Sequence, residues 1–236
     1  MIQNKKIIIG GNIMKMNREL YEQYDMVVGF KLTGIRMGNG QISALNYKSV
    51  SDNTSRITMT VEEFEEYQVK EFYETVQEVV DKIADEVDEL VPNNNVGLYY
   101  DTKIGANFGC YNWDYDDNGA ICNEHIRMSP MVVFNERQIR FLDYFNDTFG
   151  LSLKYDTKTA RVITFLHEVG HMVDYHSKDN VEDYNNKNQE LKAQLSELKT
   201  QEARDYYYRQ IPEEKVADEF AVRMLVKYYP EIAYAC

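Results

Sequence analysis

Residues 164–174 read TFLHEVGHMVD, with His167 and His171 four positions apart and Glu168 directly after the first histidine. Side chains four positions apart project from the same face of an α-helix, so the two imidazoles can bind one zinc ion, each at about 2 Å. A chance HExxH is expected in fewer than about one chain in a hundred of this composition. Two buried structural histidines are the alternative. Three of the four histidines fall within ten residues, which favours a zinc site.

The rest of this segment predicts a helix that packs tightly. Asp156 or Thr157 is the predicted N-cap. Gly170 leaves room for a close approach beside His171. A buried helix that keeps two histidines and a glutamate together needs compensation for these polar groups, and a metal ion provides it. An apolar stripe anchors the helix through Val162, Leu166, Val169 and Val173.

A third ligand must come from elsewhere in the chain. A metzincin would continue with glycine at 174 and histidine at 177, but this chain has Asp174 and Ser177, so that class is excluded. His176 lies about 180° around the helix from His167, so a continuous helix points it away from the metal.

The stretch PEEKVADEFAVRML at 212–225 supplies a better candidate. Glu214 and Asp218 fall on the inward face of a strongly amphipathic helix that begins at Pro212, and carboxylates there need a partner. We expect Glu214 to bind the metal and Asp218 to accept the second ring N–H of a ligand histidine. Glu214 could instead be a first-turn carboxylate favoured by the helix dipole, and Glu213 is its main competitor as ligand.

His167-Glu168-x-x-His171 followed by Glu214-x-x-x-Asp218 resembles the gluzincin zinc peptidases, of which thermolysin is the type case. The EKVADEFA segment at 214–221 is similar to that of small bacterial and phage-borne metallopeptidases. The resemblance covers roughly the C-terminal half of the chain. It implies a zincin-like peptidase fold in which Glu168 is the general base for a water molecule bound to the zinc.

The resemblance also implies an edge strand that binds the substrate backbone. Residues 126–133 are the predicted edge strand, with Ile126, Met128 and Ser129 as substrate-facing residues. Pro130 suits an edge because it cannot donate a hydrogen bond to a neighbouring strand.

Such a mechanism needs a donor that stabilises the oxyanion. The candidates are Tyr175, His176 and the run Tyr206, Tyr207 and Tyr208 just before the ligand helix. Because the chain has 19 tyrosines, each candidate could equally serve packing.

The remaining pattern predicts an α+β fold, and the resemblance implies that it is of the zincin type: a small mixed or antiparallel sheet with an edge strand, packed on the HExxH helix and on the later ligand-bearing helix. Residues 1–60 form a strand-rich region of unknown role, and residues 61–236 form the metallopeptidase domain. Thr60 and Glu63 form a capping box at the start of a long helix. Residues 178–210 predict one amphipathic helix with an apolar seam of Leu191, Leu195 and Leu198.

The stretch DYDDNG at 114–119 matches the first half of a calcium-binding EF-hand loop through Asp114, Asp116 and Asn118. However, His125 occupies position twelve, where a glutamate is required. Asp-Asn-Gly is a natural hairpin turn, because Asn and Gly tolerate positive φ. We therefore predict a turn here, with calcium binding as the alternative.

Charge and cysteine usage limit the partners and the compartment. The formal net charge is −13 and no cluster of Lys and Arg is present, which argues against nucleic acid and anionic membranes as partners. Three cysteines cannot all pair within one chain, although a Cys110–Cys122 bridge stays open. Without a signal-peptide core or a membrane-spanning run, we expect a cytoplasmic protein, or one exported by a signal-free route.

Two functions follow from these features. The first is a zinc-dependent endopeptidase that acts on a protein or peptide substrate. The second is a non-catalytic protein-binding module with a structural zinc in a gluzincin-like fold. Glu168 favours the peptidase, because a structural site needs no general base.

Overall fold

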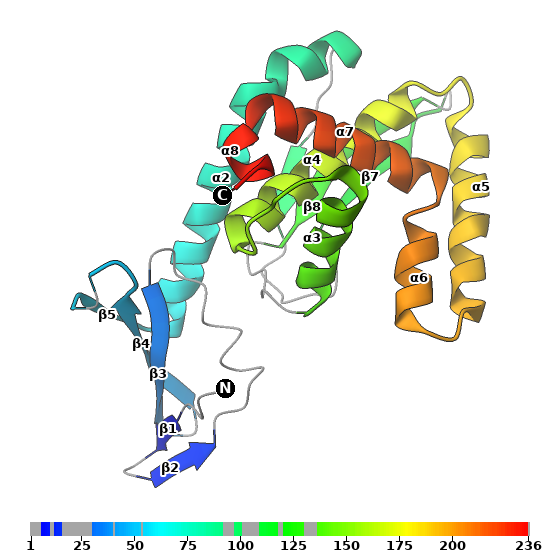
Figure 1. Ribbon diagram of the computed structural model, residues 1–236. Helices are drawn as coiled ribbons and strands as arrows, with labels where there is room; N and C mark the ends of the chain where they lie inside the picture. Colours follow the sequence, from blue (N-terminus) through cyan, green and yellow to red (C-terminus); the bar gives the residue numbers. More distant parts are fainter. Residues whose placement is uncertain are drawn as a thin grey trace.

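The computed structural model (Figure 1) describes residues 6–9, 12–15, 30–39, 41–52, 54–91, 97–100, 109–117, 120–129 and 136–235. These residues form a mixed α+β structure with two small sheets and a helical body, as the sequence predicts. Along the described part of the chain we find no helical stretch with both the length and the hydropathy that crossing a bilayer requires.

The N-terminal sheet has the strand order β2-β1-β3-β4-β5. The strands are β1 (Lys6–Ile9), β2 (Asn12–Lys15), β3 (Phe30–Gly38), β4 (Gln41–Ser49) and β5 (Arg56–Met59). Neighbouring strands are antiparallel except for β1 and β3, which are parallel. One face of β3 and β4 is buried through Leu32, Ile35, Leu45 and Tyr47, so the strand-rich character predicted for this region is confirmed in its described part.

Helix α2 (Val61–Leu90) connects this sheet to the rest of the molecule. The predicted capping box is present: the Glu63 N–H donates to Oγ1 of Thr60 at 3.1 Å, and the Thr60 N–H donates to Oε2 of Glu63 at 2.8 Å. Phe64, in the first turns, completes the apolar cluster of the N-terminal sheet, whereas Phe72 and the following turns belong to the main core. The predicted domain boundary at residue 60 therefore falls where a helix begins that contributes to both cores.

The second sheet has the order β6-β8-β7, from β6 (Gly97–Tyr100), β8 (Ile121–Met128) and β7 (Gly109–Tyr115). The predicted edge strand at 126–133 is wrong in its described part, because Ile126 and Met128 lie in the central strand. β6 pairs with β8 in parallel on one side and β7 pairs in antiparallel on the other. Ser129 follows the strand and is buried. Pro130 and residues 131–133 lie outside the described residues.

Strands β7 and β8 form the predicted hairpin. Across the turn, the Asp116 N–H donates to the Ala120 carbonyl at 2.9 Å, and the Ala120 N–H donates to Oδ1 of Asp116 at 2.9 Å. Oδ2 of Asp114 accepts from the Asn123 side chain. Both predicted calcium-binding carboxylates thus hold the hairpin, while Asn118 lies outside the described residues.

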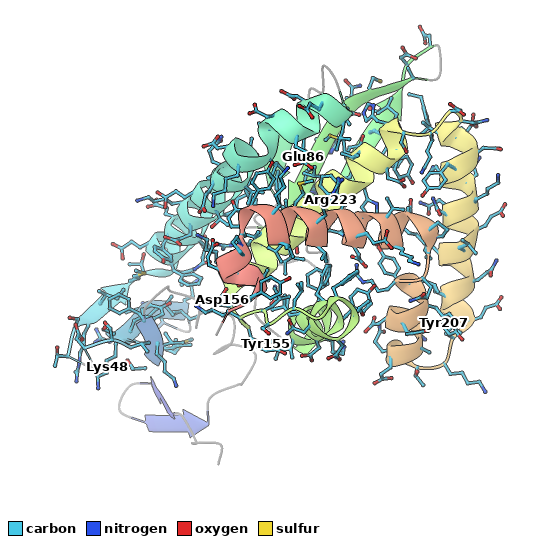
Figure 2. All side chains as sticks on the ribbon, turned by 45° about the horizontal axis from the view of Figure 1, so that its top comes forward. Lys48, Glu86, Tyr155, Asp156, Tyr207 and Arg223 are labelled. Atoms are coloured by element: carbon cyan, nitrogen blue, oxygen red, sulfur yellow. The ribbon has the colours of Figure 1, made fainter. Side chains whose placement is uncertain are left out.

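Helix α4 (Thr157–His176) is the centre of the helical body, and almost every residue from Thr159 to Tyr175 is buried. Asp156 caps it, accepting the Thr159 N–H at 2.8 Å, and Figure 2 shows Asp156 at the start of this helix. α4 packs against α7 (Pro212–Tyr228), α2 and the β7–β8 hairpin. The first turn of α7 begins at Pro212, as predicted. The short helix α8 (Pro230–Ala233) follows it, and α3 (Glu136–Phe149) precedes α4.

Residues 178–210 do not form the single helix that we predict. They form α5 (Val181–Gln194), the short 3₁₀ helix η1 (Leu195–Glu197) and α6 (Gln201–Tyr208), with α5 and α6 side by side (Figure 1). Leu198 is extended at ψ 135°, and Thr200 caps α6 by accepting the Ala203 N–H. The predicted leucine seam is interrupted, because α5 ends at Gln194, Leu195 lies in η1 and Leu198 is extended.

Candidate metal centre

Two turns of α4 place His167 and His171 side by side. Their Nε2 atoms lie 3.0 Å apart, and the two rings are nearly perpendicular at 84°. Both side chains are almost fully buried, with residue exposures of 6% and 8%. The predicted pairing of the two imidazoles on one helix face is therefore present.

Glu214, in the first turn of α7, reaches the same point. Its Oε2 lies 3.3 Å from Nε2 of His167 and 3.7 Å from Nε2 of His171. Burial alone would raise the pKa of Glu214, but the two imidazoles beside it lower that pKa well below its usual value. Within the described residues, His167, His171 and Glu214 form the one group of three such side chains that could hold a metal ion.

The spacing of these three atoms fits a tetrahedral ion. Donors at about 2.0–2.1 Å from a tetrahedral zinc lie about 3.3–3.4 Å from one another. The separations of 3.0, 3.3 and 3.7 Å bracket that value. Three protein ligands would leave the fourth tetrahedral position for a water or a substrate oxygen, as in catalytic zinc sites.

The donor set also fits a cation chemically. Oε2 of Glu214 is buried and has no hydrogen-bond partner among the described residues. A buried carboxylate oxygen without a partner costs about 1–3 kcal/mol or more. A metal ion between this oxygen and the two imidazoles would satisfy it.

Asp218, one turn after Glu214, lies behind His167. Its Oδ1 is 2.9 Å from Nδ1 of His167 and 2.9 Å from Nη1 of Arg209. Burial would lower the pKa of His167, but Asp218 and Glu214 raise it to about 9. At neutral pH the metal-free ring therefore carries a proton on both nitrogens. Asp218 holds the proton on Nδ1, so a metal would displace the proton on Nε2, which faces Glu214 and His171.

Helices α4 and α7 cross at a glycine. A Cβ on Gly170 would lie 2.8 Å from Cα and 2.9 Å from the carbonyl oxygen of Ala217. Ala217 lies between Glu214 and Asp218 on α7, so this contact brings both carboxylates up to the histidines. The close approach predicted at Gly170 is confirmed.

Replacing Gly170 with alanine should therefore separate α4 from α7. We expect the free energy of unfolding to fall by about 1–3 kcal/mol, and zinc binding to weaken because Glu214 moves away. Chemical denaturation and zinc titration measure the two effects. Gly34→Ala is the control, because a Cβ there meets nothing within 4 Å. Equal stability of Gly170→Ala and the parent would contradict the tight crossing.

Glu168 lies beside the three candidate ligands and is not part of their group. Burial raises its pKa, and the neighbouring histidines offset this only in part. Its side chain packs against β7, since a Cβ on Gly109 would come within 2.9 Å of its Oε1. Glu168 therefore lies between α4 and the strand β7, next to the three side chains that could hold a metal ion.

The five predicted oxyanion donors lie in different surroundings, and they are not equally close to the candidate metal centre. Tyr206 and Tyr207 are 61% and 52% exposed on α6, and Figure 2 shows Tyr207 away from the crossing of α4 and α7. Burial and the carboxylates of Glu214 and Glu168 raise the pKa of Tyr208, so its hydroxyl stays protonated beside the centre.

The other two candidates are engaged elsewhere. The Tyr175 hydroxyl donates to Oε2 of Glu213, and His176 contacts Oε1 of Glu124 on β8. Of the five predicted donors, Tyr208 is thus the one that lies next to both Glu214 and Glu168.

Two basic residues of the centre were not predicted. Lys192 on α5 lies 2.6 Å from Oε1 of Glu213 and 3.0 Å from Oε1 of Glu214. Arg209 pairs with Asp218 and lies over the rings of Phe141 and Tyr208. Neither stands out in a sequence, because Lys and Arg in polar helices are usually solvated. The two inward carboxylates at 213 and 214 were the available signal that a cation was needed.

Cys110 and Cys122 lie on the two strands of the β7–β8 hairpin. Cys110 and Cys122 are both free thiols. They sit at different registers of the hairpin, opposite Arg127 and Asp114 respectively. The disulfide that the sequence left open is not formed.

No protein-family model, no curated protein and no solved structure matches this chain. The function proposed for the centre therefore depends on its own geometry.

Proposed function

We propose that this protein is a zinc-dependent endopeptidase of the gluzincin type, with a zincin-like arrangement of α4, α7 and the β6-β8-β7 sheet. One observation carries the proposal. Two imidazole nitrogens and one carboxylate oxygen converge at separations of 3.0–3.7 Å, and a further buried carboxylate, Glu168, stands beside them unligated. A structural zinc site needs a fourth protein ligand and no base, whereas a hydrolytic site needs one open position and a base.

The side chains would divide the reaction between them. A bound zinc ion supplies a water of lowered pKa and polarises the substrate carbonyl. Glu168 takes the proton from the attacking water and delivers it to the nitrogen of the leaving amine. Its raised pKa suits both directions of transfer, because a carboxyl group whose pKa lies closer to the working pH can both accept and release the proton. Asp218 keeps the His167 ring in one tautomer throughout.

Strand β7 is the best surface for the substrate backbone. It is one of the two outer strands of the β6-β8-β7 sheet, and Gly109 at its start lies against Glu168. An extended peptide can add to such an edge through main-chain hydrogen bonds, which bring a peptide bond to the metal without requiring a particular sequence. We expect a protein or peptide substrate, and propose β7 in place of residues 126–133.

Tyr208 is the proposed donor to the oxyanion. Tyr208→Phe should lower kcat about 10²–10³-fold with little change in zinc content, because it removes one hydrogen bond made chiefly in the transition state. Tyr207→Phe on the exposed side of α6 is the matched control and should be silent. Steady-state kinetics on a fluorogenic peptide measures both. Equal losses in the two variants would rule out this role for Tyr208.

The function itself is tested on an unstructured protein such as casein. The zinc-loaded chain should cleave it, removal of zinc with 1,10-phenanthroline should stop cleavage, and added zinc should restore it. A zinc-loaded, folded chain that cleaves neither casein nor a diverse peptide library would contradict the peptidase. That result would favour the alternative, a protein-binding module with a structural zinc.

A further inference from the structure

The structure assigns Lys192 a positioning role: from α5 it selects Glu214 as the metal ligand and orients it to bind through a single oxygen. This inference rests on the proposed zinc site. It concerns a residue outside both ligand-bearing helices, and it explains how two adjacent buried glutamates receive different roles.

Glu213 and Glu214 are consecutive, and both are buried, with exposures of 2% and 0%. Two adjacent buried carboxylates repel one another and are costly to desolvate unless a cation lies close by. The Lys192 ammonium meets both at once, 2.6 Å from Oε1 of Glu213 and 3.0 Å from Oε1 of Glu214. One lysine therefore joins the two carboxylates that could compete for the metal.

The four oxygens of this pair are used differently. On Glu213, Oε1 pairs with the Lys192 ammonium and Oε2 accepts from the Tyr175 hydroxyl, so both oxygens have a partner. On Glu214, Oε1 pairs with the Lys192 ammonium, whereas Oε2 faces the two imidazoles. A single carboxylate oxygen is thus left for a metal, and it is the one aligned with His167 and His171.

Lys192 is itself held in place. Its ammonium lies 5.5 Å from the centre of the Tyr208 ring, and the α5 segment before it is attached to α4. The Tyr184 hydroxyl donates to Oδ2 of Asp174 at 2.6 Å, and the Tyr175 hydroxyl oxygen lies 3.3 Å from the Asn185 side chain. These contacts fix α5 at the height where a lysine side chain reaches the first turn of α7. Outer-shell partners of this kind usually contribute about 10–100-fold to metal affinity.

The test must separate positioning from simple charge compensation. Lys192→Met alone would leave Glu213 as a buried, uncompensated charge and could unfold the protein. The comparison is therefore between Glu213→Gln and the double variant Lys192→Met/Glu213→Gln, in which that charge is absent from both proteins. They differ only in the lysine that orients Glu214. Circular dichroism and thermal unfolding verify that both are folded.

The readout is zinc affinity, measured by competition with a chromophoric chelator at fixed pH. We expect the double variant to bind zinc about 10–100-fold more weakly than Glu213→Gln. Lys187→Met, on the exposed side of α5 where the lysine pairs with Asp183, should match the parent. Affinities of the double variant and Glu213→Gln within about twofold would overturn the role of Lys192. Absence of zinc binding in the parent would instead overturn the proposed zinc site itself.

Discussion

Glu168→Gln is expected to lower peptide-bond cleavage by about 10²–10⁴-fold while one zinc ion stays bound per chain. Glutamine keeps the shape of the side chain but cannot accept the proton of the attacking water. Because Glu168 is not among the three converging ligands, its carboxylate contributes little to holding the metal. Single-turnover cleavage of a labelled protein, together with elemental analysis of the same sample, measures both quantities.

The matched control is Glu219→Gln on the exposed side of α7. It removes the same charge from the chain without touching the centre, so its cleavage rate should equal that of the parent. If Glu168→Gln cleaves as fast as Glu219→Gln, Glu168 is not the base. If it loses zinc, Glu168 belongs to the coordination sphere, contrary to the geometry.

The second large effect is expected from Glu214→Ala. It removes the carboxylate oxygen that lies within 3.7 Å of both Nε2 atoms, and should weaken zinc binding by more than the roughly 100-fold typical of outer-shell losses. Metal content after dialysis against a chelator gives a direct measurement. Cleavage should fall in proportion to the zinc lost.

Glu213→Gln separates the two adjacent glutamates. Since both oxygens of Glu213 are taken by Lys192 and Tyr175, this variant should keep one zinc per chain. Retention of zinc by Glu214→Ala together with its loss from Glu213→Gln would exchange their roles. The sequence left that competition open, and the structure favours Glu214.

Local periodicity explains why much of the centre could be predicted. His167 and His171 are related by one helical turn, and so are Glu214 and Asp218, so each pair is defined by spacing alone. The caps at Thr60 and Asp156 were predictable for the same reason, since a cap depends on residues within one turn. The structure brings the two pairs together at the contact between Gly170 and Ala217.

Features that depend on distant pairing could not be predicted. The order β6-β8-β7 places Ile126 in the middle of its sheet, and no local property of residues 121–128 reveals that a second strand covers their other side. Lys192 is similar: it lies more than 20 residues from Glu214 in sequence and occupies a polar helix, so its contact with two buried carboxylates follows only from the fold.

Zinc K-edge X-ray absorption of the purified, zinc-loaded chain tests the central claim most directly. We predict a first shell of nitrogen and oxygen donors at about 2.0–2.1 Å, with the outer-shell scattering of two imidazoles and with no sulfur. In Glu214→Ala the imidazole scattering should persist only to the extent that zinc is retained. A shell containing a thiolate at about 2.3 Å, or one without two imidazoles, would contradict the site of His167, His171 and Glu214.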